Sequence, residues 1–313
     1  MSKFYFRNLD GIRFIGALMV IIHHIEQNKS VFGIRNAWTN SVIQSIGPLG
    51  VNLFFTLSGF LITYLLIHEY NSNKAIDIKS FYIRRILRIW PLYFLLIILG
   101  FFLLPLVVPA EFNVFNLPNY GQRLLLFCTF LPNVSYIVNG TTPFVHQLWS
   151  IGVEEQFYLV WPLLILLSPG KKTSVLLFFL TYMSAVVLVN KFAGSETILY
   201  KILSKARFSA MAIGGLMGYI VYYKTKGYQL IQSGIFGWLT FIITILLIVK
   251  SVYVPYIGYE IYAVLFAILI AHFSVSPKPI FSLDYDVLNY FGKISYGLYM
   301  YHSIMIFLSI KFL

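Results

Sequence analysis

Cysteine and charged residues are both scarce in this chain. Its 313 residues include one cysteine, and only 11% are charged, against about 25% in a typical soluble domain. The single cysteine, Cys128, excludes a disulfide within the chain, a CxxC motif and a zinc finger. With 59% hydrophobic residues and a mean hydropathy of +0.79, one soluble core could not bury the apolar surface. The composition therefore predicts an all-α polytopic membrane protein.

Acidic residues are the rarer charged class. There are 11 Asp and Glu against 23 Lys and Arg, which gives a net charge of +12. A basic chain can indicate nucleic acid as a partner, but no RNA- or DNA-binding module is present. Membrane proteins carry Lys and Arg in loops that face anionic lipids. We therefore expect membrane lipids, and no nucleic acid, as partners.

Long apolar runs are abundant, and a membrane helix needs about 20 such residues. We expect one membrane domain, residues 1–313, with about ten transmembrane helices, a retained first span and a cytoplasmic N-terminus. The fourth segment contains Pro132, Asn133 and Ser135, so it either spans or is re-entrant. Loop charges do not choose between nine and ten spans. The predicted segments are Gly11–Ile25, Gly47–Ile67, Ile86–Val108, Leu124–Val138, Val153–Leu167, Val175–Val189, Phe208–Tyr223, Gly234–Val249, Tyr256–Phe273 and Phe291–Phe312.

The first predicted span, within LDGIRFIGALMVIIHH, contains an arginine and two histidines. Polar and ionisable residues inside a membrane are costly, which favours a function for them. Arg13 and His24 are eleven residues apart, so a helix places them on one face, roughly 16 Å apart along its axis. His23 is turned about 80° away from Arg13. The alternative is an arginine that snorkels and a histidine that caps the outer end.

Two further motifs carry charge into predicted helices. Arg85 and Arg88 in FYIRRILRIWPLYF lie one turn apart, and arginine forks suit phosphate oxygens. Positive-inside anchoring is the alternative. Glu154 and Glu155 open an apolar helix, where acidic residues favour the helix dipole, so capping is the alternative to a function. Adjacent helical residues differ in direction by about 100°, so the two glutamates must point differently. A glutamate in a bundle interior could orient a histidine or a substrate hydroxyl.

The last predicted span carries a polar stripe. Ser295, Tyr299 and His302 fall at positions i, i+4 and i+7, which favours a face toward protein or a cavity. A packed, hydrogen-bonded His302 is at least as plausible as a catalytic one. In Ile46–Thr63, glycines and Ser58 alternate with bulky residues, and close helix packing is the favoured interpretation.

Together these motifs resemble the bacterial acyltransferase-3 family of integral membrane O-acyltransferases. The matching segments cover essentially the whole chain in family order: LDGIRFIGALMVIIHH, GVNLFFTLSGFLIT, FYIRRILRI, WSIGVEEQFYLVWPLL, RFSAMAIGGLMGY and ISYGLYMYH. The resemblance implies about ten helices. It also implies transfer of an acyl group, usually acetyl, from cytoplasmic acyl-CoA to a hydroxyl of an extracytoplasmic glycan or glycolipid at the cell (inner) membrane.

The resemblance also assigns residues. The Arg-x10-His motif falls on Arg13 and His24, the Arg-x-x-Arg motif on Arg85 and Arg88, and the glutamate on Glu154. On this basis His24 and Glu154 are the catalytic candidates, with His24 as general base. Arg13, Arg85 and Arg88 are the candidates for binding acyl-CoA, and no metal is expected.

Two positions depart from the family pattern. Asn52 stands where an acidic residue is frequent, and Gln147 stands where a histidine is frequent, with His146 one place earlier. A catalytic acid at the first position is therefore doubtful. The acceptor, the acyl chain and the oligomeric state stay open.

Other classes of protein share some of these features. A transporter or flippase for a glycan also carries buried Arg, Glu and His, but no inverted repeat is evident. An intramembrane serine protease could use Ser58 and His302, but the GxSG sequence that usually surrounds the serine is missing here. An acyl-enzyme relay through His24 or Tyr299 is a variant of the acyltransferase mechanism.

Overall fold

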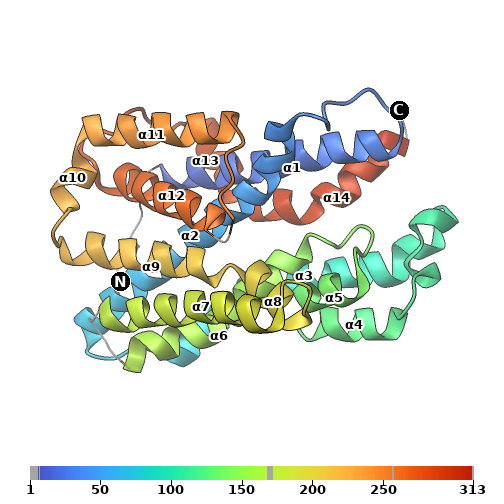
Figure 1. The fold of residues 1–313 in the computed structure, drawn as a ribbon, viewed down its shortest axis with the longest axis horizontal. Helices are drawn as coiled ribbons and strands as arrows, with labels where there is room; N and C mark the ends of the chain where they lie inside the picture. Colours follow the sequence, from blue (N-terminus) through green and yellow to red (C-terminus); the bar gives the residue numbers. More distant parts are fainter. Residues whose placement is uncertain (1–5, 7, 168–171, 256, 312–313) are drawn as a thin grey trace.

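The protein folds as a bundle of α-helices. The computed structural model describes residues 6, 8–167, 172–255 and 257–311, and within these ranges it contains no β-strand. Most of the long helices run along the same axis, with α11, α12, α13, α1 and α14 on one side and α6 and α7 on the other (Figure 1). The helices are α1 (Leu9–Val31), α2 (Ser41–Asn73), α3 (Ile78–Ile98), α4 (Tyr120–Cys128), α5 (Pro132–Asn139), α6 (Leu148–Leu167), α7 (Lys172–Ala193), α8 (Ile198–Ala206), α9 (Phe208–Tyr223), α10 (Tyr228–Gln232), α11 (Gly234–Val249), α12 (Gly258–Val275), α13 (Asp286–Lys293) and α14 (Ser295–Lys311).

Five helices are long and apolar enough to cross a membrane. They are Ser41–Asn73, Ile78–Leu106, Leu148–Leu167, Thr173–Ala193 and Gly258–Val275, and Gly234–Val249 is a shorter apolar helix. The all-helical prediction is confirmed, whereas the predicted count of about ten spans is not. Helix α1 has 23 residues but is not among the five, because polar and charged side chains interrupt its apolar sequence. Tyr256 and Phe312, which belong to two predicted segments, lie outside the described residues.

The segment predicted as the fourth span is not one helix. Helices α4 and α5 are separated by Phe130, whose φ of 58° breaks the helical path, and Pro132 begins the second helix. The π-helix Leu99–Leu103 and the 3₁₀ turns Leu104–Leu106, Ala110–Phe112 and Val114–Asn116 lead from α3 toward α4. A continuous span over 124–138 is therefore wrong for this chain.

Helix α2 is the centre of the bundle, and it packs against α1, α6, α9, α11 and α12. Its contact with α9 brings backbone against backbone. A Cβ atom on Gly59 would lie 1.9 Å from the carbonyl oxygen of Met211, and one on Gly214 would lie 2.0 Å from that of Thr56. Small residues permit this approach, so the packing interpretation of the Ile46–Thr63 stretch is confirmed at Gly59.

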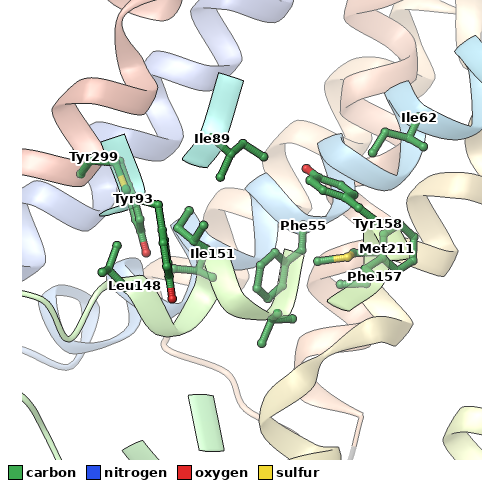
Figure 2. Close-up of a cluster of buried hydrophobic side chains, with 14 of the residues drawn as sticks. Phe55, Ile62, Ile89, Tyr93, Leu148, Ile151, Phe157, Tyr158, Met211 and Tyr299 are labelled. Carbon is green, nitrogen blue, oxygen red and sulfur yellow. The ribbon is translucent and has the colours of Figure 1, made fainter. Parts of the chain in front are cut away.

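Large side chains fill the space between α6 and its neighbours. Figure 2 shows Phe55 of α2, Tyr93 of α3, Phe157 of α6 and Met211 of α9 gathered in one cluster. Trp161 is fully buried beside it, and its indole Nε1 donates a hydrogen bond to the Thr63 hydroxyl at 2.8 Å. This cluster ties α6 to α2, so that the polar residues at the start of α6 face the interior.

Candidate active site

The arginines predicted from the sequence meet in one cavity. We call it the arginine cavity; Arg13 of α1, Arg85 and Arg88 of α3, and Glu154 of α6 line it, together with residues of α2 and α14. Three helices that are distant in the sequence therefore contribute its charged groups. Positive-inside anchoring, the alternative explanation for these arginines, needs only that basic residues face the lipid surface. It does not explain why arginines from separate helices meet in one cavity.

Arg85 is held in this cavity mainly by aromatic rings. Its guanidinium lies 5.4 Å from the ring centroid of Phe81 and 5.4 Å from that of Tyr158. Its buried Nε has no hydrogen-bond partner among the described residues. Buried donors are normally paired, so this N–H is available for an acceptor atom. Arg84 behaves differently: its side chain is 60% exposed and approaches Glu69 at 3.8 Å.

The two adjacent glutamates of α6 point to different places, as their helical positions predict. Glu154 lines the arginine cavity, whereas Glu155 accepts a hydrogen bond from Trp90 Nε1 at 3.0 Å. The hydroxyl of Ser58 pairs with the hydroxyl of Tyr158 at 2.7 Å. His302 forms its hydrogen bonds elsewhere, so Ser58 and His302 do not form the dyad that the serine-protease alternative requires.

A second cavity contains histidines. We call it the histidine cavity; His23, His24, His146, Lys205 and Arg207 line it, together with Trp149 and residues of the loop 141–144. It lies toward the C-terminal end of α1, whereas the arginine cavity lies toward the N-terminal end of the same helix. Arg13 and His24 thus both face the bundle interior, but each belongs to a different cavity.

His24 is surrounded by hydrogen-bond partners. Its Nδ1 lies 3.0 Å from the carbonyl oxygen of Val20 and 3.0 Å from His302 Nε2. Because a carbonyl oxygen only accepts, we place the proton of the neutral ring on Nδ1. His302 Nδ1 faces the carbonyl of Tyr299, so its proton is on Nδ1 and its Nε2 accepts from His24, with the Ser303 hydroxyl 3.3 Å from the same atom. The basic nitrogen of His24 is therefore Nε2.

His146 meets that basic nitrogen. Its Nε2 lies 3.2 Å from His24 Nε2, so its N–H can donate to His24. His146 lies in the turn before α6, outside the membrane-spanning helices. Loss of hydration lowers the pKa of His146 to about 4, with a smaller lowering by nearby His23. A neutral His146 keeps a positive charge away from the ring of His24 at neutral pH.

Two side chains lie between the two cavities and line both of them. They are Val51 of α2 and Tyr299 of α14. The hydroxyl of Tyr299 lies 2.6 Å from that of Ser150 and donates to the carbonyl oxygen of Gln147 at 3.1 Å. A group that moved past these two side chains would pass from the arginines to His24.

Three further positions named from the sequence have the following neighbours. Glu154 does not contact His24, so the group that sets the His24 tautomer is the Val20 carbonyl with His302. Asn52 is fully buried and donates to the carbonyl oxygen of Tyr259 at 2.9 Å, while its Oδ1 has no hydrogen-bond partner among the described residues. Gln147 donates to the carbonyl oxygens of Phe144 and Met300.

Sequence reasoning missed several residues of the histidine cavity. The sequence motifs assign no role to Lys205 or Arg207, although an arginine directly before the apolar run FSAMAIGG is a signal of the same kind as Arg13. His146 and His302 occur in the motifs without an assigned role. Among the described residues no group of three His, Cys, Asp or Glu side chains is arranged to hold a metal ion.

The family model for the acyltransferase domain of the acyltransferase-3 family matches residues 6–313. The chain belongs to this family. Its match covers nearly the whole sequence, including α1 with Arg13 and His24 and α14 with His302.

Relatives in this family are O-acetyltransferases by name. The peptidoglycan O-acetyltransferase OatA of Listeria monocytogenes is 28% identical over 332 residues, which cover 96% of this chain and 49% of the relative. The O-acetyltransferase OatA of Staphylococcus aureus is 29% identical over 326 residues, which cover 96% of this chain and 50% of the relative. The chain thus spans about half the length of these relatives. No solved structure matches it.

Proposed function

We propose that this protein is a multi-pass membrane O-acyltransferase. It moves an acyl group, acetyl in the simplest case, from cytoplasmic acyl-CoA to a hydroxyl of an extracytoplasmic carbohydrate. The observation that supports this best is the pair of cavities that share Val51 and Tyr299. One is lined by arginines and the other by histidines, which suits an anionic donor and a hydroxyl acceptor. Membership of the acyltransferase-3 family supports the same reaction.

The arginine cavity suits the donor. Acyl-CoA is anionic, and arginine binds phosphate oxygens through paired N–H groups. The unpartnered Nε of Arg85 offers one such donor. With a cytoplasmic N-terminus, Arg13, Arg85 and Arg88 hold the phosphates, and the thioester end of the molecule extends toward Tyr299. Glu154, in the same cavity, positions these guanidinium groups.

His24 acts as the general base on the acceptor side. Its Nδ1–H is held by the Val20 carbonyl, so Nε2 presents a lone pair. The acceptor hydroxyl takes the place of the His146 N–H at this atom. Neutral imidazole is suited to accept a hydroxyl proton near neutral pH.

The transfer step balances without any further reactant. The acceptor oxygen forms a bond to the thioester carbonyl carbon as its proton moves to His24 Nε2. The carbon–sulfur bond then breaks, and the proton on His24 passes to the departing CoA thiolate. The products are the O-acyl sugar and free CoA.

The direct test is turnover by the purified full-length chain in proteoliposomes. Acetyl-CoA and a peptidoglycan fragment are the first pair to supply, because one relative is named for that acceptor. Release of CoA thiol that depends on the glycan, together with an O-acetyl ester on the glycan, supports the proposal. Movement of an unmodified glycan across the membrane without consumption of acyl-CoA would instead indicate a transporter or flippase. Comparing acyl esters on cell-surface glycans with and without the gene would identify the natural acceptor.

A further inference from the structure

Two cations line the histidine cavity, and neither has a place in the mechanism above. Lys205 lies at the end of α8, and Arg207 joins α8 to α9 with a left-handed backbone, φ 48° and ψ 34°. Both are half-buried. Among the described lining residues they are the only Lys, Arg, Asp or Glu side chains. The cavity that His24 lines therefore also carries two positive charges.

Arg207 is fixed by an aromatic ring and a carbonyl group. Its guanidinium carbon lies 3.6 Å from the ring centroid of Tyr259, and Nη1 donates to the carbonyl oxygen of Pro48 at 3.0 Å. Its Nε is buried and has no hydrogen-bond partner in the described chain. Part of the guanidinium fork is thus held in place, and a further N–H is left for a ligand.

Lys205 lies against an aromatic ring of the same cavity. Its ammonium nitrogen is 4.0 Å from the ring centroid of Tyr136. Burial lowers the pKa of Lys205 below its usual value, and the charges of Arg207 and then Lys201 lower it further. The two cavity cations therefore repel each other, and an anion placed near both would relieve this repulsion.

Neither cation has an acidic partner. In the described part of the chain, no carboxylate lies within 4.0 Å of Lys205 or Arg207. Glu260 accepts a hydrogen bond from the Ser209 hydroxyl at 2.6 Å instead. By contrast, Lys201 on the same helix as Lys205 pairs with Glu196 at 2.7 Å. Half-buried cations normally have a counter-charge, which here is left for a ligand to supply.

We propose that the histidine cavity binds an acceptor that carries an anionic group, a carboxylate or a phosphate, at Lys205 and Arg207. This contact places a hydroxyl of the same acceptor at His24. Trp149 and Tyr136 line the cavity and offer flat apolar faces to sugar rings. The inference builds on the proposed function but concerns binding, which is measurable without acyl transfer.

The test measures binding of three tetrasaccharides to the purified full-length chain without an acyl donor. One is a neutral N-acetylglucosamine tetramer, one alternates N-acetylglucosamine with glucuronic acid, and one is the neutral tetramer carrying a terminal phosphate. We expect at least one anionic probe to bind about tenfold more tightly than the neutral one, as a charged hydrogen bond would give. Which anion is preferred distinguishes a carboxylate acceptor from a phosphorylated one.

The variants locate the preference. The double variant Lys205→Gln/Arg207→Gln should bind all three probes equally, while Lys201→Gln, outside the cavity, should keep the preference. Arg207 also donates to the Pro48 carbonyl, so its replacement could prevent folding. In that case the single variant Lys205→Gln is used instead, and it should weaken the preference for anionic probes. Equal binding of neutral and anionic probes to the wild-type chain, or a preference that survives both cavity substitutions, would overturn the inference.

Transfer assays on the same samples separate the two proposals. An anion preference without acyl transfer would contradict the proposed function alone. Acyl transfer to the neutral tetramer, with no preference for the anionic ones, would contradict this inference alone.

Discussion

His302 Nε2 lies 3.0 Å from His24 Nδ1, although 278 positions separate the two residues. The contact joins α14 to α1 and fixes the ring of the residue that we propose as the general base. His302 is itself fixed, because its Nδ1 faces the carbonyl of Tyr299. The pair therefore holds His24 with Nε2 toward the histidine cavity.

Replacing His302 with glutamine should reduce kcat about tenfold to hundredfold, because a small misplacement of a reacting group has effects of this size. The KM for acyl-CoA should stay near its wild-type value, since His302 lies away from the arginines. Steady-state kinetics with each substrate varied in turn would measure both.

His272→Gln is the control: this buried histidine bonds the Ile231 carbonyl and the Ile280 N–H outside both cavities. It should lower thermal stability while kcat per folded molecule is kept; an equal fall in kcat for both variants would contradict the positioning role.

Arg85→Ala should raise the apparent KM for acyl-CoA about tenfold or more, and that for the acceptor much less. A charged hydrogen bond contributes about 1.5–3 kcal/mol, which corresponds to such a change. The neighbouring Arg84→Ala is a matched control, because its side chain is 60% exposed and lies outside the cavity lining. An unchanged donor KM in Arg85→Ala would show that the arginine cavity does not bind the donor.

Tyr299→Phe distinguishes direct transfer from a relay through the tyrosine oxygen. In direct transfer the variant loses two hydrogen bonds, to the Ser150 hydroxyl and to the Gln147 carbonyl, each worth about 1 kcal/mol, so the rate should stay within about thirtyfold of wild type. In a relay the variant should be inactive, and acyl label should be found on Tyr299 in the wild-type chain after donor is supplied alone. Mass spectrometry of the digested protein would detect that label.

Gly214→Ala should destabilise the bundle by about 1–3 kcal/mol or more, because the added methyl group would lie 2.0 Å from the Thr56 carbonyl oxygen. Gly121→Ala in α4 is the control, since nothing lies within 4 Å of its Cβ position. Thermal unfolding in detergent compares the two. Equal midpoints would mean that α2 and α9 do not approach as closely as the structure has them.

The sequence predicts the fold class and the location of much of the site for clear physical reasons. Apolar runs have to be helices in a bilayer, and helical spacing puts Arg13 and His24 on one face. Adjacent positions in α6 similarly predict that Glu154 and Glu155 point apart. Each of these inferences uses geometry within a single helix.

Contacts between helices are what the sequence did not provide. Spacing could not show that His302 reaches His24 or that Glu154 does not, because each depends on how α1, α6 and α14 pack. The break at Phe130 depends on one residue with positive φ, which is rare outside glycine. Lys205 and Arg207 join the histidine cavity only because α9 packs against α2 while α8 packs against α5 and α7.

The most direct test of the account is the acyl-transfer rate of His24→Ala beside that of His23→Ala in proteoliposomes. General bases contribute about 10²–10⁴-fold, so His24→Ala should lose activity by that factor while remaining folded and keeping its KM for acyl-CoA. The His23→Ala protein should retain most of the wild-type activity, because the Nδ1 of His23 bonds the Ile43 carbonyl at 2.9 Å and not His24. A folded His24→Ala protein that transfers the acyl group at the wild-type rate would contradict the central claim.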